Sequence, residues 1–547
     1  MGIRIVQPDA NAYPYPLLIK QLLHTPLAVA PDQEIIYKDA VRYRYRDLRG
    51  RIGRLANALT ARGAQQGMTI AVMDWDSHRY LECFFAVPMM GAVLQTVNIR
   101  LAPEQILYTL KHAKAEVLLV HRDFLPVVEK LREHLPAVKS FIAIDDGTSG
   151  AWPAWFDAEY EALLAAASPE YDFPDFDENA MATTFYTTGT TGDPKGVFAT
   201  HRQLVLHTLA MLSVNNSVGA GQNFRGTDVY MPMTPMFHVH AWGTPYAATL
   251  MGVKQVYPGR YLPEELLNLR EKHRVTYSHC VPAILQMLLK AAAERKADLA
   301  GWKIVIGGSA LPEGLAREAL SMGVDVWAGY GMSETGPVLT KSRIFGKAGS
   351  LDDEVRRRCR AGMAIPLVDL RIVDPEMRDV PRDGKSTGEI VARAPWNTQC
   401  YVGNPEASRE LWRGGYLHTQ DVGMFDAEGY VQITDRTKDV IKTGGEWLSS
   451  LELESVISRH PGVAEVAVVG VKDDRWGERP MALIVVRPSH AGKVSIADVR
   501  KEVEKEVDTG VLPRYAIPER VLFIDAIDRT SVGKIDKKVL RQKYAQQ

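Results

Sequence analysis

The sequence predicts an α/β protein with a large N-terminal domain of several subdomains, built on parallel-rich sheets, and a small, mobile α+β C-terminal domain. Short β-branched runs alternate repeatedly with helical patterns, which is typical of parallel sheets covered by helices. The chain has 547 residues, several times the roughly 100–200 residues typical of one domain, so it should divide into at least two units. The runs that we expect to form strands include residues 69–73, 116–120, 303–306 and 324–327.

A domain boundary is predicted near residues 435–439, which divides the chain into residues 1–435 and 436–547. The second part contains three strand-like runs, at 465–471, 481–486 and 521–524.

One amphipathic helix is predicted in this second part. Ser495 followed by Asp498 resembles a capping box, and apolar residues then recur at helical spacing. The apolar face of the helix should cover the small sheet with Ile496, Val499, Val503 and Val507.

Composition and charge exclude several classes of protein. A formal net charge of -1 provides no general attraction for nucleic acid or anionic membranes. The four cysteines are far apart and form no pattern with metal-binding spacing, so we expect reduced thiols in a cytoplasmic protein. No apolar run reaches the roughly 20 residues that a transmembrane helix needs, and peripheral contact with a membrane stays open.

A glycine- and threonine-rich loop is the first chemical motif. In the run TFYTTGTTGDPKG, residues 184–196, a strand leads into hydroxyls, glycines and one lysine. Glycine allows close backbone approach, while threonine hydroxyls and a lysine suit phosphate oxygens. The Walker pattern GxxxxGK[ST] is absent. A flexible Gly/Thr hairpin is the alternative; the candidate phosphate-binding residues are Thr187, Thr188, Gly189, Thr190, Thr191 and Lys195.

Six further motifs follow in order. They are PMFHVHAWG at 235–243, IGGSA at 306–310, AGYGMSETG at 328–336, WRGGYLHTQD at 412–421, ITDRTKDVIKTGGEW at 433–447 and DRTSVGKIDK at 528–537. Together with the phosphate loop, they resemble the adenylate-forming superfamily of acyl-CoA synthetases, adenylation domains and luciferases. The resemblance covers nearly the whole chain and is greatest to medium- or long-chain fatty-acyl-CoA synthetases.

The resemblance implies roles in nucleotide and metal binding. Thr187 and Glu334 would be catalytic and would bind Mg²⁺. Tyr330 would stack on adenine, Ser333 would reach phosphate and Asp421 would bind the ribose hydroxyls. Gln420 stands where glycine is usual. The other expected nucleotide-site residues are the phosphate-loop residues above with Trp242, Gly308, Ser309, Ala310, Gly329, Gly331 and Arg436.

The same resemblance implies a pocket for the acid. It would be formed by His238, Trp242, Gly307 and Gly308, with Trp242 closing an acyl tunnel until nucleotide binds. For an isolated His or Trp, core packing is the usual alternative. His240 departs from the asparagine that is usual in close fatty-acyl relatives.

The C-terminal motifs would supply a mobile catalytic group. By the resemblance, Lys534 is the catalytic lysine, and Lys438 is the hinge about which the C-terminal domain rotates between two half-reactions. The nucleotide and thiol-access region would include Lys442, Gly444, Gly445 and Trp447. The nearby lysines Lys537 and Lys538 are expected on the surface.

The expected function is an ATP-dependent acyl-CoA ligase that acts on medium- or long-chain fatty acids, with ATP, Mg²⁺ and coenzyme A as cofactor and co-substrates. Alternatives that remain open are a ligase for a short thioether or aromatic acid, a carrier-protein-loading enzyme, a luciferase-like oxygenase and a noncatalytic acyl-nucleotide sensor. The fatty-acyl relatives also make a homodimer an expectation.

Overall fold

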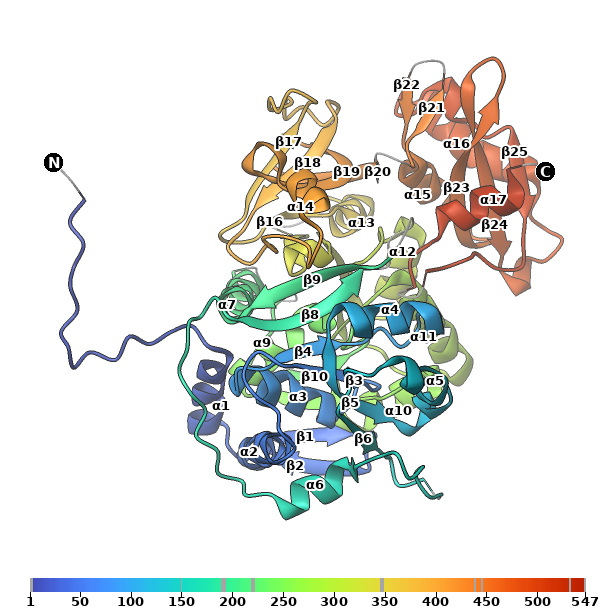
Figure 1. The fold of residues 1–547 in the computed structure, drawn as a ribbon. Helices are drawn as coiled ribbons and strands as arrows, with labels where there is room; N and C mark the ends of the chain where they lie inside the picture. The colour runs from blue at the N-terminus through green and yellow to red at the C-terminus, as the bar shows by residue number, and fades with distance from the viewer. Residues whose placement is uncertain are drawn as a thin grey trace.

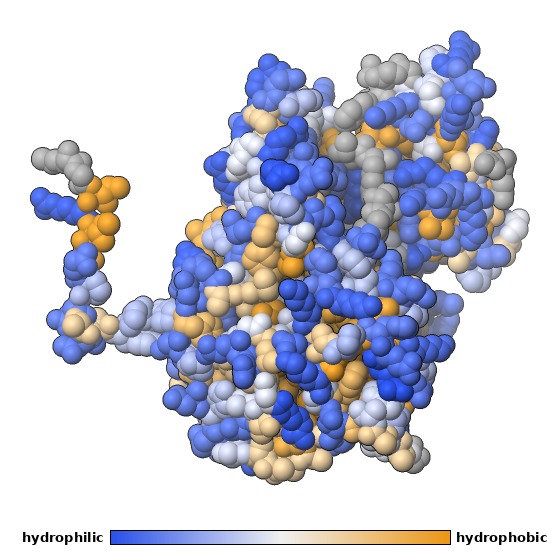
Figure 2. Space-filling view, in the orientation of Figure 1, coloured by the Kyte–Doolittle hydropathy of each residue, from blue (hydrophilic) through white to orange (hydrophobic). Residues whose placement is uncertain are grey.

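The computed structural model describes residues 3–148, 150–187, 193–217, 222–344, 349–436, 439–443, 446–530 and 533–545. The predicted α/β class is confirmed: parallel-rich sheets with covering helices form a large N-terminal body, and a smaller C-terminal unit lies beside it (Figure 1). The first residues extend away from the body, and Figure 2 shows apolar residues gathered on this segment, where Ile3, Ile5 and Val6 are exposed.

The first large sheet has the strand order β7-β6-β5-β3-β4-β8-β9, in which only the β8–β9 pair is antiparallel. Every residue of β3 is buried, as expected for a strand covered on both faces. The bounds are β3 Thr69–Met73, β4 Val93–Thr96, β5 Ala115–His121, β6 Ser140–Ile144, β7 Ala158–Glu159, β8 Met181–Thr187 and β9 Lys195–Thr200.

The second large sheet has the order β16-β15-β14-β13-β12-β10-β11-β1-β2. Its central strands run parallel, and antiparallel strands finish both edges. The carboxyl ends of β12, β13 and β14 therefore meet at one edge. The bounds are β1 Glu34–Tyr37, β2 Val41–Arg44, β10 Val229–Pro232, β11 Lys254–Tyr257, β12 Tyr277–Cys280, β13 Lys303–Ile306, β14 Asp325–Gly331, β15 Val338–Lys341 and β16 Met363–Ala364.

Helices cover both sheets. In α3 (His78–Met89) every residue is buried, because the helix lies inside the main hydrophobic core. No helix in the described ranges is both long and apolar enough to cross a membrane. The other helices of this body are α1 His24–Val29, α2 Tyr45–Ala61, α4 Pro103–His112, α5 Leu125–Leu131, α6 Tyr160–Ala166, α7 His201–Asn216, α8 Val239–Trp242, α9 Thr244–Met251, α10 Pro263–His273, α11 Pro282–Arg295, α12 Glu313–Ser321, α13 Leu351–Cys359 and α14 Pro405–Leu411.

A third, antiparallel sheet leads to the C-terminal unit. Its order is β17-β18-β19-β20, and its core includes Ile372, Ile390 and Val431. The last strand brings the chain to the predicted domain boundary. The bounds are β17 Asp369–Val373, β18 Gly388–Arg393, β19 Leu417–Phe425 and β20 Val431–Arg436.

The C-terminal unit has its own sheet and core. The order is β22-β21-β24-β23, with β25 parallel to β24. The bounds are β21 Ile441–Thr443, β22 Glu446–Leu448, β23 Val463–Asp473, β24 Gly477–Val486, β25 Arg520–Phe523, α15 Ser450–Ser458, α16 Ile496–Asp508 and α17 Lys537–Tyr544. We retain a domain boundary near Lys438 as a proposal; Lys438 itself lies outside the described residues.

Polar contacts hold the C-terminal unit against the N-terminal body. Arg459 Nε lies 3.1 Å from Glu313 Oε2, and Arg487 Nη2 lies 2.7 Å from Glu318 Oε2, so both carboxylates belong to α12. These contacts are ionic and partly exposed. An interface of this kind separates more readily than one made by a hydrophobic core, because partly exposed ion pairs contribute little stability.

Two expectations about the C-terminal unit are corrected. The capping box of α16 is present, and Val499 and Val503 are buried, but Ile496 is 44% exposed because this first helical residue lies beyond the packed part of the helix. Lys537 was expected on the surface and is instead 8% exposed. Its Nζ lies 2.8 Å from Glu454 Oε1, so a buried ion pair holds α17 to α15.

Candidate active site

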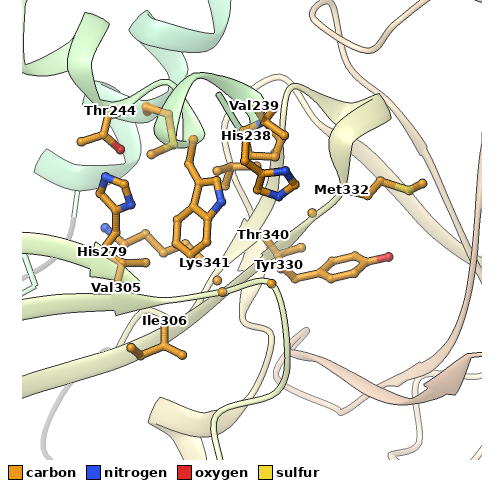
Figure 3. Close-up of a pocket in the computed structure, with 18 of the residues that line it drawn as sticks. His238, Val239, Thr244, His279, Val305, Ile306, Tyr330, Met332, Thr340 and Lys341 are labelled. Carbon is orange, nitrogen blue, oxygen red and sulfur yellow. The ribbon is translucent and has the colours of Figure 1, made fainter. Parts of the chain in front are cut away.

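A cavity lies where the carboxyl ends of β12, β13 and β14 meet α8. Its space amounts to about 660 Å³, including the part that is open to solvent. Crevices at the carboxyl ends of parallel strands are the expected binding sites of open α/β sheets. The close-up in Figure 3 shows His238, Tyr330 and His279 around this space.

Glycines bring the backbone of two strands to the cavity surface. A Cβ at Gly307 would lie 3.0 Å from Trp242 Cη2 and 3.3 Å from the Gly329 carbonyl oxygen. Gly308 has φ +77°, a conformation that side chains rarely adopt. A flat group can therefore approach the backbone closely here.

Trp242 is held in the cavity by an unusual turn. Val239, His240, Ala241 and Trp242 have φ values of 47°, 54°, 47° and 58°. Left-handed residues cost about 1–2 kcal/mol each, so packing must hold the turn. His240 contributes to that packing, because its ring meets the edges or faces of Phe84 and Phe185 at 5.5 and 5.3 Å.

The Trp242 ring lies over the glycines and 5.1 Å from the His279 ring. The tryptophan is 8% exposed, and its ring lies near both Gly308 and His279 in the cavity lining. His238 lines the same space, and burial lowers its pKa to about 3, so the imidazole is neutral near pH 7.

One end of the cavity carries a linked tyrosine and aspartate. Tyr330 Oη donates a hydrogen bond of 2.8 Å to Asp421 Oδ2, and Arg436 Nε lies 3.3 Å from Asp421 Oδ1. Burial raises the pKa of Asp421 above its usual value, while Arg436 opposes the rise. Gln420 has φ +60°, a left-handed conformation that is uncommon for a residue with a side chain.

Lys534 reaches the cavity from the C-terminal unit. A Cβ on Gly308 would lie 3.6 Å from Lys534 Cε. A tight turn holds the lysine: Gly533 has φ +83°, and the Lys534 amide donates to Thr530 Oγ1 at 3.2 Å. Burial and the Arg436 charge lower the pKa of Lys534 to about 8, while Asp421 and Glu334 oppose the shift.

Glu334 is held by a residue that the motifs did not indicate. The carboxylate is 6% exposed and accepts a 2.7 Å hydrogen bond from Tyr401 Oη. Lys195 Nζ lies 4.8 Å from the centre of the same tyrosine ring, and Lys195 pairs with Thr187 across the β8–β9 hairpin. Tyr401 therefore links the glutamate to the base of the phosphate loop.

These oxygen donors fit Mg²⁺. Mg²⁺ is usually held by one or two carboxylates together with waters and substrate phosphates. Glu334 offers one carboxylate and Thr187 a hydroxyl, and no cluster of three or more His, Cys, Asp or Glu suited to a metal occurs within the described ranges.

Nine of the expected residues line this one cavity. His238, Trp242, Gly307, Gly308, Gly329, Tyr330, Gly331, Ser333 and Lys534 line the cavity. Ser309 and Ala310 follow the glycine turn outside the lining, and Lys442 is exposed on β21. Thr188, Gly189, Thr190, Thr191, Lys438, Gly444, Gly445 and the side chain of Trp447 lie outside the described residues.

Sequence reasoning missed three residues of this region: Tyr401, His279 and Lys341. The available signal for Lys341 was a charged residue directly after the short β-prone run Val338 to Thr340. No local pattern distinguishes Tyr401 or His279.

The fold and the cavity together define an enzyme of the adenylate-forming type. The chain belongs to the AMP-binding enzyme family: residues 23–402 match its family model, and residues 452–534 match the model of the AMP-binding enzyme C-terminal domain.

Named relatives extend over almost the whole chain. A long-chain-fatty-acid–CoA ligase of Thermus thermophilus is 39% identical and covers 98% of both chains. A 3-methylmercaptopropionyl-CoA ligase of Ruegeria pomeroyi is 36% identical over 90% of each. The anthranilate CoA ligase AuaEII, solved in complex with anthranoyl-AMP, has a TM-score of 0.85 at 25% identity and covers 98% of both chains.

Proposed function

We propose that this chain is an AMP-forming acid–CoA ligase that acts on medium- or long-chain fatty acids. It converts the acid and ATP to an acyl-adenylate and pyrophosphate, and then converts the adenylate and CoA to acyl-CoA and AMP. The class of reaction follows from the family and from relatives named as CoA ligases. The single observation that carries the proposal is Lys534, whose side chain lines the same cavity as Tyr330 and Trp242.

The first half-reaction makes the carboxyl group a better acyl donor. A carboxylate would have to lose oxide, whereas an adenylate loses AMP. A carboxylate oxygen attacks the α-phosphorus, and the bond to the pyrophosphate oxygen breaks. The Lys534 ammonium would stabilise the negative charge that two approaching anions bring together. When bound, Mg²⁺ would neutralise phosphate charge beside Glu334 and Thr187.

The nucleotide would lie along the glycine backbone. Tyr330 would place its ring against the adenine, and Asp421 would accept hydrogen bonds from the ribose hydroxyls. The pairing of Tyr330 with Asp421 supports this role, because it fixes both side chains before the ligand binds.

The second half-reaction needs a different arrangement. The thiol sulfur attacks the acyl carbonyl, the thiol loses its proton and the bond from carbonyl carbon to AMP breaks. Lys442 and Trp447 pair across the β21–β22 hairpin. In Figure 1 this hairpin lies on the side of the C-terminal unit that faces away from β8 and β9. We propose that the C-terminal domain rotates near Lys438 to exchange Lys534 for this hairpin.

The lining supports an aliphatic acid. Apolar side chains line the cavity together with Trp242, and movement of Trp242 would open more of the cavity to a longer chain. The apolar contributors are Met211, Val239, Val305, Ile306 and Val338.

The test is CoA-dependent AMP formation with short, medium, long and aromatic acids. We expect aliphatic acids of medium or long chain to support turnover, and Lys534→Ala to reduce the rate about 100- to 1,000-fold, as for loss of a charge-stabilising group. Lys538→Ala is the matched control, because Lys538 is exposed four residues away. If no acid supports AMP formation by the wild type, the sensor or carrier-loading alternatives replace the proposal.

A further inference from the structure

Lys341 is a buried cation in the wall of the acyl cavity, and the proposed reaction does not use it. It ends β15, pairs with Gly329 across the sheet and is 2% exposed. Figure 3 shows Lys341 and His279 in one part of the cavity, while the Tyr330 phenol points away from both. Lys341 thus belongs to the end that receives the acid rather than the nucleotide.

Contacts around Trp242 give the same order along the cavity. The Trp242 indole lies close to Gly308, which Lys534 approaches, and the centre of the Trp242 ring lies 5.1 Å from that of the His279 ring. An acyl chain whose carboxyl group meets Lys534 must pass Trp242 to reach the Lys341 end.

The described residues use only part of the hydrogen-bonding capacity of the Lys341 ammonium. An ammonium has three N–H donors. Lys341 Nζ donates to Asn215 Oδ1 and lies 5.0 Å from the centre of the Trp327 ring. No carboxylate of the described residues lies within 4.0 Å of this nitrogen.

Neighbouring acids are already paired with other cations. Asp325 Oδ1 lies 2.5 Å from Arg358 Nη1, and Asp228 Oδ2 lies 2.7 Å from Lys303 Nζ. Burial, with the charges of Lys303 and Arg343, lowers the pKa of Lys341 to about 7, while Asp325 opposes the shift. Among the described residues no carboxylate offsets the cost of burying this ammonium, and an added anion would stabilise the charged form of Lys341.

The histidine beside Lys341 does not fill this need. His279 Nε2 is 2.8 Å from Tyr230 Oη, and His279 Nδ1 is 3.1 Å from Thr234 Oγ1, so both ring nitrogens have partners. Burial lowers the His279 pKa to about 3 and keeps the ring neutral. The unused donor capacity at this end therefore belongs to Lys341.

A plain alkyl end fits this environment poorly. A methyl terminus would replace any water around the ammonium and return no hydrogen bond, which costs free energy. An oxygen acceptor at the same place would instead gain a charge-assisted hydrogen bond.

We propose that Lys341 selects acids that carry an oxygen acceptor at the end remote from the reacting carboxyl group, a second carboxylate being the strongest form. The inference rests on the proposed function and narrows its substrate class from fatty acids in general to ω-oxygenated aliphatic acids. Lys341 is then a specificity-determining residue that contacts the distal end of the substrate.

The experiment compares three acids of equal length: the monocarboxylic acid, its ω-hydroxy derivative and the α,ω-dicarboxylic acid. The readout is kcat/KM for CoA-dependent AMP formation, repeated across medium and long chains. We expect the wild type to prefer the dicarboxylic acid over the monocarboxylic acid by about 10- to 100-fold, the effect of one hydrogen bond to a charged group, with the hydroxy acid between them.

Lys341→Met removes the charge and keeps a long apolar side chain. It should reverse the preference, lowering kcat/KM for the dicarboxylic acid and raising it for the monocarboxylic acid. Lys290→Met is the matched control, because Lys290 is exposed on α11, and it should leave the ratio unchanged. The wild-type ratio tests the inference even if Lys341→Met does not fold.

The possible outcomes distinguish a failure of the Lys341 inference from a failure of the ligase proposal. Equal kcat/KM for the three acids, or a wild-type preference for the monocarboxylic acid, overturns the role of Lys341 and leaves the ligase proposal intact. A dicarboxylate preference that survives in a folded Lys341→Met variant also overturns it. Absence of AMP formation with every acid overturns the ligase proposal and the inference with it.

Discussion

Replacing Tyr401 by phenylalanine removes one hydroxyl that contacts Glu334, the proposed Mg²⁺ ligand. The hydroxyl donates a 2.7 Å hydrogen bond to Glu334 Oε1, and its pKa is raised by burial and by the Glu334 charge, so it stays protonated as a donor. Phenylalanine keeps the ring over which Lys195 lies at 4.8 Å. The change therefore isolates the hydrogen bond.

The expected magnitude follows from the charge and burial of the acceptor. A hydrogen bond to a charged group contributes about 1.5–3 kcal/mol. Since about 1.4 kcal/mol corresponds to a tenfold change, loss of this bond should lower kcat/KM for Mg·ATP by about 10- to 100-fold. The reason is that Glu334 would lose the donor that fixes its orientation toward the metal.

The assay is acid-dependent exchange of pyrophosphate into ATP, measured over a range of Mg²⁺ concentrations. Tyr416→Phe is the matched control, because Tyr416 Oη also donates a 2.7 Å hydrogen bond to a carboxylate, that of Asp369, but at an exposed site. Tyr416→Phe should stay within about twofold of the wild type, as an exposed pair contributes little. Equal rates for the two variants would refute the assigned role of Tyr401.

Three further predictions concern charge and packing. Because the pKa of Lys534 is lowered to about 8, the lysine loses its positive charge as pH rises through that value, and the rate of pyrophosphate exchange should fall there. The Lys534→Arg variant should keep its rate constant to higher pH, because arginine stays charged. A rate that stays constant above pH 8 would contradict this. Gly307→Ala places a Cβ 3.0 Å from Trp242 Cη2, so KM for the acid should rise about tenfold, which is within the cost of overpacking. Gly349→Ala is the control, because a Cβ there meets no atom within 4 Å, and it should leave KM unchanged. Equal KM values for the two variants would contradict this prediction. Lys537→Met leaves the buried Glu454 carboxylate without its ionic partner. The free energy of unfolding of the C-terminal unit, measured by urea denaturation, should fall by about 3–5 kcal/mol. A loss below about 1 kcal/mol would show that the ion pair is not coupled to folding.

Local sequence patterns predicted strands well where they are buried and continuous. Residues 69–73 and 303–306 coincide with β3 and β13. The strand expected at 324–327 instead runs through Gly331, because β15 pairs with its glycine-rich end. Such pairing depends on a distant segment, and no property of the glycines themselves reveals it.

The candidate site was predicted through ordered motifs, which identify residue types but not their partners. Tyr401 meets Glu334 across 67 positions of sequence, so no local spacing links them. The left-handed turn that ends at Trp242 contains no glycine before Gly243 and was equally hidden. Lys537 was misplaced because an isolated lysine is usually exposed, whereas its partner Glu454 lies on another helix.

We propose that Lys534 serves the first half-reaction and leaves the cavity for the second. The most direct measurement supplies Lys534→Ala with presynthesised acyl-adenylate and CoA, and compares acyl-CoA formation with adenylate formation from acid and ATP. We expect adenylate formation to fall about 100-fold or more, while transfer from the adenylate stays within a few-fold of the wild type. An equal loss in both half-reactions would contradict it.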